Sequence, residues 1–357
     1  MQRECKTSVQ GALLWQTGGL PFALKSIMPP PLLPLSVAIA CQGGGSHTAF
    51  TAGVLQALLA GIDPARHAIR GLSGTSGGAL CAGLAWAGLV QGDPRDGGRR
   101  LDAFWHDLVA RAPADLIANL GLVWLQRSRD WLTLPEVSPY SLPEFGRTFL
   151  AELIDEHIPF ARLMPDVGPG TPRLLVGAVE VLSGQFTVFS SHAEDPALAV
   201  GRDALLASAA IPELFRATRI AGGVYWDGLF SQNPPIRGFV SGHPSAEAKP
   251  DEIWVIQINP EGRDQEPRST ADIADRRNEL AGNLSLAQEL FFVDQVNRWL
   301  AEGWLPASHF KPITVRRIEL RLDLDYPSKL DRREEFIETL LAEGKSAGMA
   351  FLAGLPG

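Results

Sequence analysis

The chain has 357 residues, of which 45% are hydrophobic and 20% charged, a composition typical of a globular protein with one large domain or two small ones. Its net charge of -8 argues against nucleic acid as a partner, because binding to a phosphate backbone requires a basic surface. The cysteines Cys5, Cys41 and Cys81 lack the spacing and the nearby histidines of a metal site. We therefore expect no metal, no disulfide framework and a reduced, cytoplasmic setting.

Residues 1–34 differ in character from the rest of the chain, because prolines at positions 29–31 interrupt their mildly apolar stretch. We interpret them as an N-terminal extension that precedes a single domain of residues 35–357. Residues 38–41 resemble a lipoprotein cleavage box, but cleavage there would remove the strand that leads into the next loop. No apolar run reaches the length of a membrane span, so we expect any membrane contact to be peripheral.

The first structural unit begins with the apolar residues 35–41, which predict a buried strand. A glycine cluster, Gly43-Gly44-Gly45, follows, and Ser46 is expected to cap a helix over residues 47–61. Backbone N–H groups in a glycine loop at the start of a helix are well placed to bind an anion.

The second unit repeats this arrangement, with a strand at residues 69–73 and a helix at 78–90. Between them lies Gly74-Thr75-Ser76-Gly77-Gly78, which matches the strand-turn-helix pattern of a nucleophile elbow. The turn lifts a serine hydroxyl clear of the backbone, and the N–H of the next residue faces the place where an oxyanion forms. On its own the pentapeptide is equally a glycine-rich turn, and the upstream glycine loop favours the catalytic interpretation.

Further helices and strands alternate along the chain, which predicts an α/β fold with a largely parallel sheet. Helices are expected at residues 101–111, 142–155, 201–210, 272–300 and 332–352, and strands at 172–181, 184–190, 251–258 and 315–322. A hairpin-like stretch at 219–226 leads to Asp227-Gly228.

Residues 115–139 are rich in leucine and carry Trp124 and Trp131 around a polar stretch. Two interpretations stay open. The segment is either a packed helical insertion or an apolar lid or rim over the candidate site.

The glycine loop, the elbow and the downstream Asp-Gly pair together resemble the patatin-like phospholipase family. The matching blocks are Gly43-Gly44-Gly45 with Gly53 and Leu55, Gly74 to Gly78, Ala207 to Pro212 with Phe215, and Asp227-Gly228 with Asn233 and Pro235. Their occurrence in this order is far more specific than any one block. The resemblance implies a three-layer α/β/α fold with a mostly parallel central sheet.

The resemblance also implies a function, that of a hydrolase which cleaves fatty-acyl esters of lipids through an acyl-enzyme intermediate. Ser76 would be the nucleophile and Asp227 the base of a catalytic dyad, with no metal or organic cofactor. The implied oxyanion hole consists of backbone groups of Gly43, Gly44, Gly45 and Gly77. The expected partner is a lipid or fatty-acyl ester, met at a membrane or micelle surface.

Two features of the implied site need further conditions. An ordinary aspartate, with a pKa near about 3.9, is a weak base, so Asp227 must be partly buried to accept a proton from serine. Many family members carry an arginine after the glycine run, whereas this chain has Ser46-His47-Thr48. His47 would support the oxyanion only when protonated, near its ordinary pKa of about 6.5, and a packing role is an equal alternative.

Two other functions remain open from the sequence. One is a patatin-fold module that binds lipid without catalysis, against which the intact Ser76 and Asp227 argue. The other is an α/β-hydrolase esterase with a Ser-Asp-His triad, which requires a histidine after the acid. His243 and His309 are the histidines in such a position.

Overall fold

The first predicted strand, β1, lies inside the sheet, with β2 on one side and β7 on the other. The computed structural model describes residues 33–128, 137–212, 214–241 and 245–356, and the account below concerns these residues. Contacts within the chain separate Met1–Leu33 from Pro34–Gly357, and the latter unit contains all described helices and strands. The division into an extension and one domain stays a prediction.

The sheet has eight strands in the order β5-β6-β3-β2-β1-β7-β8, and β4 also pairs with β3. The strands are β1 Leu35–Cys41, β2 His67–Gly74, β3 Arg173–Glu180, β4 Phe186–Ser190, β5 Thr218–Ile220, β6 Gly223–Asp227, β7 Glu252–Gln257 and β8 Thr314–Glu319. The central run from β3 through β2, β1 and β7 to β8 is parallel. The pairs of β4 and β6 with β3, and of β5 with β6, are antiparallel, so the prediction of a mostly parallel central sheet is confirmed.

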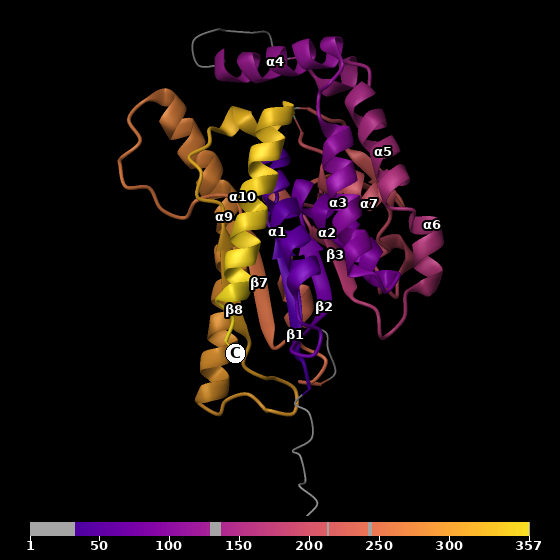
Figure 1. Cartoon of the computed structure of the whole chain (residues 1–357), viewed down its shortest axis with the longest axis vertical. Coiled ribbons are helices and arrows are strands. Elements are labelled where there is room, and N and C mark those ends of the chain that lie inside the picture. The colour runs from indigo at the N-terminus through magenta and orange to yellow at the C-terminus, as the bar shows by residue number, and fades with distance from the viewer. Residues whose placement is uncertain (1–32, 129–136, 213, 242–244, 357) are drawn as a thin grey trace, which may run out of the picture. The chain divides into compact units, whose positions relative to one another are not determined.

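Helices cover both faces of this sheet, as Figure 1 shows for α1, α2 and α10 in front of it. The helices are α1 Ala49–Gly61, α2 Gly77–Val90, α3 Pro94–Leu108, α4 Pro113–Ser128, α5 Phe145–His157, α6 Phe160–Leu163, α7 Arg202–Ser208, α8 Arg237–Val240, α9 Thr270–Ala301 and α10 Glu334–Ala353. Short 3-10 turns include η1 Gly45–Thr48, η5 Gly228–Phe230 and η6 Tyr326–Leu330.

Alternate side chains of β1 show why two helical layers form. Val37 and Ile39 belong to the core shared with α1, α2, α3 and α10, whereas Ala38 and Ala40 belong to the core shared with α8 and α9. A strand that is apolar on both faces needs cover on both sides. The predicted three-layer α/β/α architecture is therefore confirmed.

Two helix starts differ from their sequence predictions. α1 begins at Ala49, because residues 45–48 form η1 instead, and Ser46 makes no capping hydrogen bond. α3 begins at Pro94, seven residues before the predicted start at Leu101. There the Asp93 carboxylate accepts a hydrogen bond from the N–H of Arg95, a capping contact that starts the helix in a charged segment ahead of the predicted one.

The apolar segment of residues 115–139 is described only in part, since residues 129–136 lie outside the described residues. Its described part is mainly α4, whose buried Asn119 bonds to the backbone of Leu330, at the end of η6, and of Arg332, two residues later. Ile117, Leu120 and Trp124 are exposed on the same helix. α4 is therefore attached to the domain by a polar contact, and the choice between packed insertion and lid stays open.

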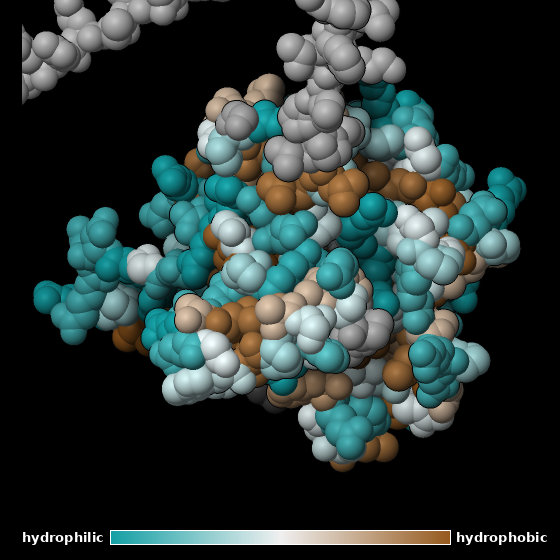
Figure 2. All heavy atoms as spheres, turned by 90° about the horizontal axis from the view of Figure 1, so that it is seen from below, coloured by the Kyte–Doolittle hydropathy of each residue, from teal (hydrophilic) through white to brown (hydrophobic). Residues whose placement is uncertain are grey.

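The strands of the sheet have one end near the start of the described chain and the other near α4. In Figure 1 the described chain starts at the bottom, so β1 runs from there toward the end of the sheet near which α4 lies. Figure 2 shows the lower face, where hydrophilic side chains are interspersed with small hydrophobic patches. Among the described helices, no single one is long and apolar enough to cross a membrane, although α3 and α4 pass that test as a pair bent by 85°.

Candidate active site

Ser76 stands in the predicted strand-to-helix turn, between the end of β2 and the start of α2. Its φ of 56° and ψ of -131° are a backbone conformation that residues with side chains rarely adopt, as expected in an elbow. The turn is tight, since a Cβ atom at Gly74 would lie 2.4 Å from the carbonyl oxygen of Gly78. Glycine is therefore required beside the serine for steric reasons.

A second serine holds this turn in place. The N–H of Ser76 donates a hydrogen bond to Oγ of Ser208 at 2.9 Å, and that hydroxyl donates to the carbonyl of Gly177 at 2.7 Å. Ser208 lies at the end of α7 and is fully buried. Its hydroxyl thus links the elbow to β3. The sequence block around residue 208 pointed to this helix, but no local pattern indicated its hydroxyl as the support of residue 76.

We expect Ser208→Ala to lower kcat about tenfold, because the strained turn loses the acceptor of its own N–H group. An unpaired buried donor also costs roughly 1–3 kcal/mol of unfolding free energy. Ser191→Ala is the matched control, since Ser191 is buried and likewise accepts from a backbone N–H, that of Leu174, at 2.9 Å. Steady-state kinetics and urea unfolding should show similar stability losses but a kcat change only for Ser208. Equal kcat values would limit Ser208 to a structural role.

Asp227 reaches the elbow from the end of β6, which lies beside β3 in the sheet. Asp227 is 1% exposed, and its carboxylate accepts a hydrogen bond from the N–H of Leu229 at 2.8 Å. Burial raises the pKa of Asp227 to about 7, although the N–H of Leu229, the hydroxyl of Ser76 and the charge of Lys329 act in the opposite direction. The carboxylate is therefore a far stronger base than an ordinary aspartate.

The glycine loop packs directly on the elbow. A Cβ atom at Gly43 would lie 2.3 Å from the carbonyl oxygen of Thr75, and one at Gly77 would lie 2.2 Å from Oγ1 of Thr48. Gly45 has a φ of 57°, in the left-handed region. Only residues without a side chain permit this approach.

The N–H groups of this loop are not equivalent. Gly43 donates its N–H to Oδ1 of Asn233 at 2.6 Å, so this donor of the predicted oxyanion set already has an acceptor within the chain. Asn233 is fully buried and thereby fixes the start of the loop. Among the hydrogen bonds of the described residues, none is donated by the N–H of Gly44, Gly45 or Gly77. These three groups remain available to an oxyanion.

Comparison with known families decides the assignment. The family model of patatin-like phospholipases matches residues 39–240, which is more than half of the chain and includes both Ser76 and Asp227. The chain belongs to the patatin-like phospholipase family. The resemblance seen in the sequence motifs is thus confirmed, and at the family level the protein is placed among lipid acyl hydrolases.

Solved structures similar to this patatin-like chain are remote. VipD from Legionella pneumophila shares 15% identity, with 89% of this chain and 67% of VipD covered and a TM-score of 0.42. The type III effector protein ExoU shares 15% identity, with 91% of this chain and 53% of ExoU covered and a TM-score of 0.34. The chain therefore spans about half the length of ExoU. None of the curated proteins matches the sequence.

His47, which takes the place of the arginine of many patatin-like proteins, is buried in η1 and bonds through Nε2 to Oγ of Ser328 at 2.8 Å. Ser328 donates its own proton to the carbonyl of Asp325, so Nε2 of His47 must carry the hydrogen. Burial, reinforced by the charge of Lys329, lowers the pKa of His47 to about 3. Of the two interpretations of His47, the lowered pKa and these contacts favour the packing role, and support of an oxyanion stays a prediction.

In the described part of this patatin-like domain, the histidines that a catalytic triad would require are not found bonded to Ser76 or Asp227. His309 is exposed and bonds to Oγ of Ser308 at 2.9 Å, while His243 lies outside the described residues. No histidine of the described residues hydrogen-bonds to Ser76 or Asp227. One group of metal-type ligands, Asp107, Glu156 and His157, lies on α3 and α5 and not on the elements that carry the dyad.

Gln42 is a further residue of the patatin-like site whose role the sequence did not reveal. Its Oε1 accepts the N–H groups of Ile258 and Asn259, each at 2.9 Å, and its Nε2 donates to Oδ1 of Asn283 at 2.8 Å. The side chain thus joins the end of β1 to the end of β7 and to α9. It fixes the strand from which the glycine loop starts.

Proposed function

We propose that the protein hydrolyses fatty-acyl esters of lipids by a Ser76-Asp227 dyad through an acyl-enzyme intermediate. The observation that carries the proposal is the buried carboxylate of Asp227, whose pKa burial raises to about 7 and the Ser76 hydroxyl lowers, together with the strained turn that holds Ser76. The membership of the patatin-like phospholipase family supports lipid as the substrate class.

The proposed reaction has two halves. Asp227 accepts the Ser76 proton as Oγ attacks the ester carbonyl carbon, and the resulting oxyanion is bound by the free N–H groups of Gly44, Gly45 and Gly77. The intermediate then collapses, the bond to the alcohol breaks, and Asp227 returns the proton to the leaving oxygen. Water attacks the acyl-serine in the same way, with Asp227 accepting its proton and passing it to Ser76, so that a fatty acid is released.

Product analysis tests this proposal most directly. The purified protein would be incubated with phospholipid, lysophospholipid, triacylglycerol and short p-nitrophenyl esters, and released fatty acid would be measured by mass spectrometry. Labelling by a fluorophosphonate, mapped by peptide sequencing, should mark Ser76. Lipid binding without fatty-acid release and without labelling would favour the silent lipid-binding module. The cytoplasmic location and the contact with a membrane surface stay predictions.

The reaction should depend on pH through Asp227. A base must be ionised to act, and the pKa of this carboxyl is raised to about 7, so kcat/KM should rise with pH along a limb centred near about 7. The limb would not come from His47, whose pKa is lowered to about 3. Hydrolysis of a soluble p-nitrophenyl ester between about pH 5 and pH 8 measures it. A rate that is already constant at the acid end would exclude Asp227 as a base of raised pKa.

A further inference from the structure

Lys329 lies against the glycine loop although it is remote in sequence. It belongs to η6, outside residues 39–240 that the family model matches. A Cβ atom at Gly45 would lie 2.2 Å from the carbonyl oxygen of Lys329, and one at Gly44 would lie 3.6 Å from its Cε. Both the backbone and the aliphatic stem of Lys329 therefore line the loop that carries the oxyanion donors.

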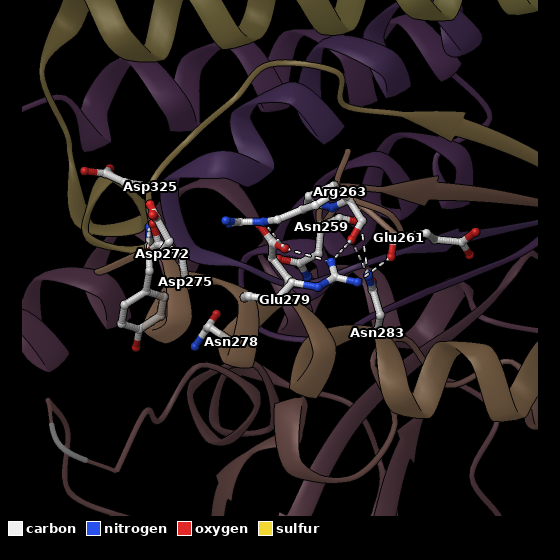
Figure 3. A network of polar contacts seen from close by, with 12 residues as sticks. Asn259, Glu261, Arg263, Asp272, Asp275, Asn278, Glu279, Asn283 and Asp325 are labelled. Atoms are coloured by element: carbon white, nitrogen blue, oxygen red, sulfur yellow. Dashed lines mark hydrogen bonds and ion pairs between the residues drawn. The ribbon is translucent and has the colours of Figure 1, made fainter. Parts of the chain in front are cut away.

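The ammonium group of this lysine is held by neutral partners. Nζ donates to Oδ1 of Asn259 at 2.9 Å and to Oδ1 of Asn278 at 2.8 Å, and it lies 5.5 Å from the ring centroid of Tyr326. Figure 3 shows that Asn259 and Asn278 come from the end of β7 and from α9. In the part of the chain that the structure describes, no carboxylate forms an ion pair with Nζ. Its positive charge is positioned but not cancelled by direct contact.

Charged groups on each neighbouring element act on Lys329 from a longer distance. Burial lowers the pKa of Lys329 to about 8, while Glu279, Asp275 and Asp227 oppose this shift. Glu279 is already paired with Arg263 at 2.6 Å and with Arg276 at 2.9 Å. Asp325, beside η6, is paired with Arg127 at 2.8 Å, and His47 in η1 is neutral. Asp227 is thus one of the few nearby charges without its own cationic partner.

The link between Lys329 and Asp227 is mutual. The charge of Lys329 lowers the pKa of Asp227, in opposition to burial, and therefore favours the ionised carboxylate that accepts the Ser76 proton. Lys329 is partly exposed and, with Asn259 and Asn278, lines a pocket of about 590 Å³. The lysine can therefore exchange its proton with solvent.

We propose that Lys329 is a positioning residue of the Ser76-Asp227 site, which braces the glycine loop with its stem and backbone and favours the ionised form of Asp227 by its ammonium charge. This inference rests on the proposed function. It implies that the active form has Asp227 ionised and Lys329 protonated. With the pKa of Asp227 raised to about 7 and that of Lys329 lowered to about 8, kcat/KM should have a bell-shaped pH profile.

The test compares pH profiles of kcat/KM for the parent, Lys329→Arg and Lys329→Met with a soluble p-nitrophenyl ester, from about pH 5 to pH 10. The parent should lose activity along an alkaline limb near about 8. The arginine variant should lack this limb, because a guanidinium stays protonated throughout. The methionine variant should lose about tenfold in kcat/KM at neutral pH, with its acid limb moved upward by roughly one pH unit.

Lys345→Met is the matched control, because Lys345 is a half-exposed lysine of α10 whose Nζ lies 3.8 Å from Asp102. Both limbs should be unchanged in this variant. An alkaline limb that persists in Lys329→Arg, or an acid limb that does not move in Lys329→Met, would reduce Lys329 to a brace of the loop. The activity assigned to the site is the parental rate minus the rate of Ser76→Ala. If the parent has no such activity, the dyad itself is refuted, and this outcome is distinct from a failure of the Lys329 proposal.

A second variant covers the case in which Lys329→Met does not fold. Asn278→Asp places a carboxylate where an amide now accepts the ammonium proton at 2.8 Å, so it should stabilise the protonated lysine. The alkaline limb should then move to higher pH. A limb at the parent position in a folded Asn278→Asp protein would overturn the proposal.

Discussion

Ser76→Ala is expected to lower ester hydrolysis by about a thousandfold or more, because the attacking atom is removed and binding groups alone leave little catalysis. The fold should be kept, since alanine retains Cβ at a residue whose φ is 56° and whose N–H is bonded to Ser208. Initial rates with a p-nitrophenyl ester, thermal unfolding and fluorophosphonate labelling measure the three consequences.

Ser73→Ala provides the control for this change. Ser73 is a fully buried serine of β2, three residues before Ser76, and its Oγ has no hydrogen-bond partner among the described residues. Its removal should leave the rate within about twofold, since no contact to the dyad is lost. A Ser76→Ala protein that keeps a tenth of the parental rate would remove this hydroxyl from the mechanism.

Asp227→Asn should abolish activity almost as fully as Ser76→Ala and, at the same time, stabilise the fold above neutral pH. The pKa of Asp227 is about 7 in the folded protein against 3.8 for the ordinary group, so between these values the folded chain holds a proton that the unfolded chain has lost. Stability therefore falls as pH rises through this window. Above it, the buried charge costs a few kcal/mol, on the order of 4, which the neutral amide avoids.

Urea unfolding at about pH 4 and pH 9, with rates measured in parallel, tests both parts. Asp331→Asn is the control, because Asp331 is equally buried at 1% exposure but is paired with Arg333 at 2.6 Å. Loss of that pair should destabilise the protein. An Asp227→Asn protein that is less stable than the parent at pH 9 would contradict the raised pKa. Loss of activity in His309→Ala or His243→Ala to the level of Ser76→Ala would instead support the triad.

The parts of the site that the sequence predicts are those built from neighbours along the chain. An apolar run followed by glycines predicted β1 with its loop and β2 with the turn at Ser76. Each of these strands and turns depends on residues that are neighbours along the chain. Asp227 was predicted because an Asp-Gly pair follows a short hairpin. The pair also comes after the other blocks that resemble the family, in the order expected for its aspartate. The role of the dyad stays a prediction.

The contacts that tune the site join residues far apart in sequence. His47 meets Ser328 across 281 positions, and Gly43 gives its N–H to Asn233 across 190. Neither pairing leaves a pattern in either segment, so the sequence could not show that Gly43 already donates its N–H or that His47 is bonded to a distant serine. Lys329 was overlooked for the same reason. Local propensity also failed at α3, where one capping carboxylate, Asp93, outweighed the low hydrophobicity of the segment.

The place of β1 inside the sheet bears on where the catalytic unit ends. Its partner β7 lies beyond residue 240, the last position matched by the family model, as do β8, α9 and α10. A fragment cut at that boundary would keep Ser76 and Asp227 yet leave one side of β1 without a neighbour, an open edge prone to pair with other chains. It would also lose Gln257 and Asn259 beside the loop. We therefore expect the smallest piece that folds to be longer than the segment matched by the family model.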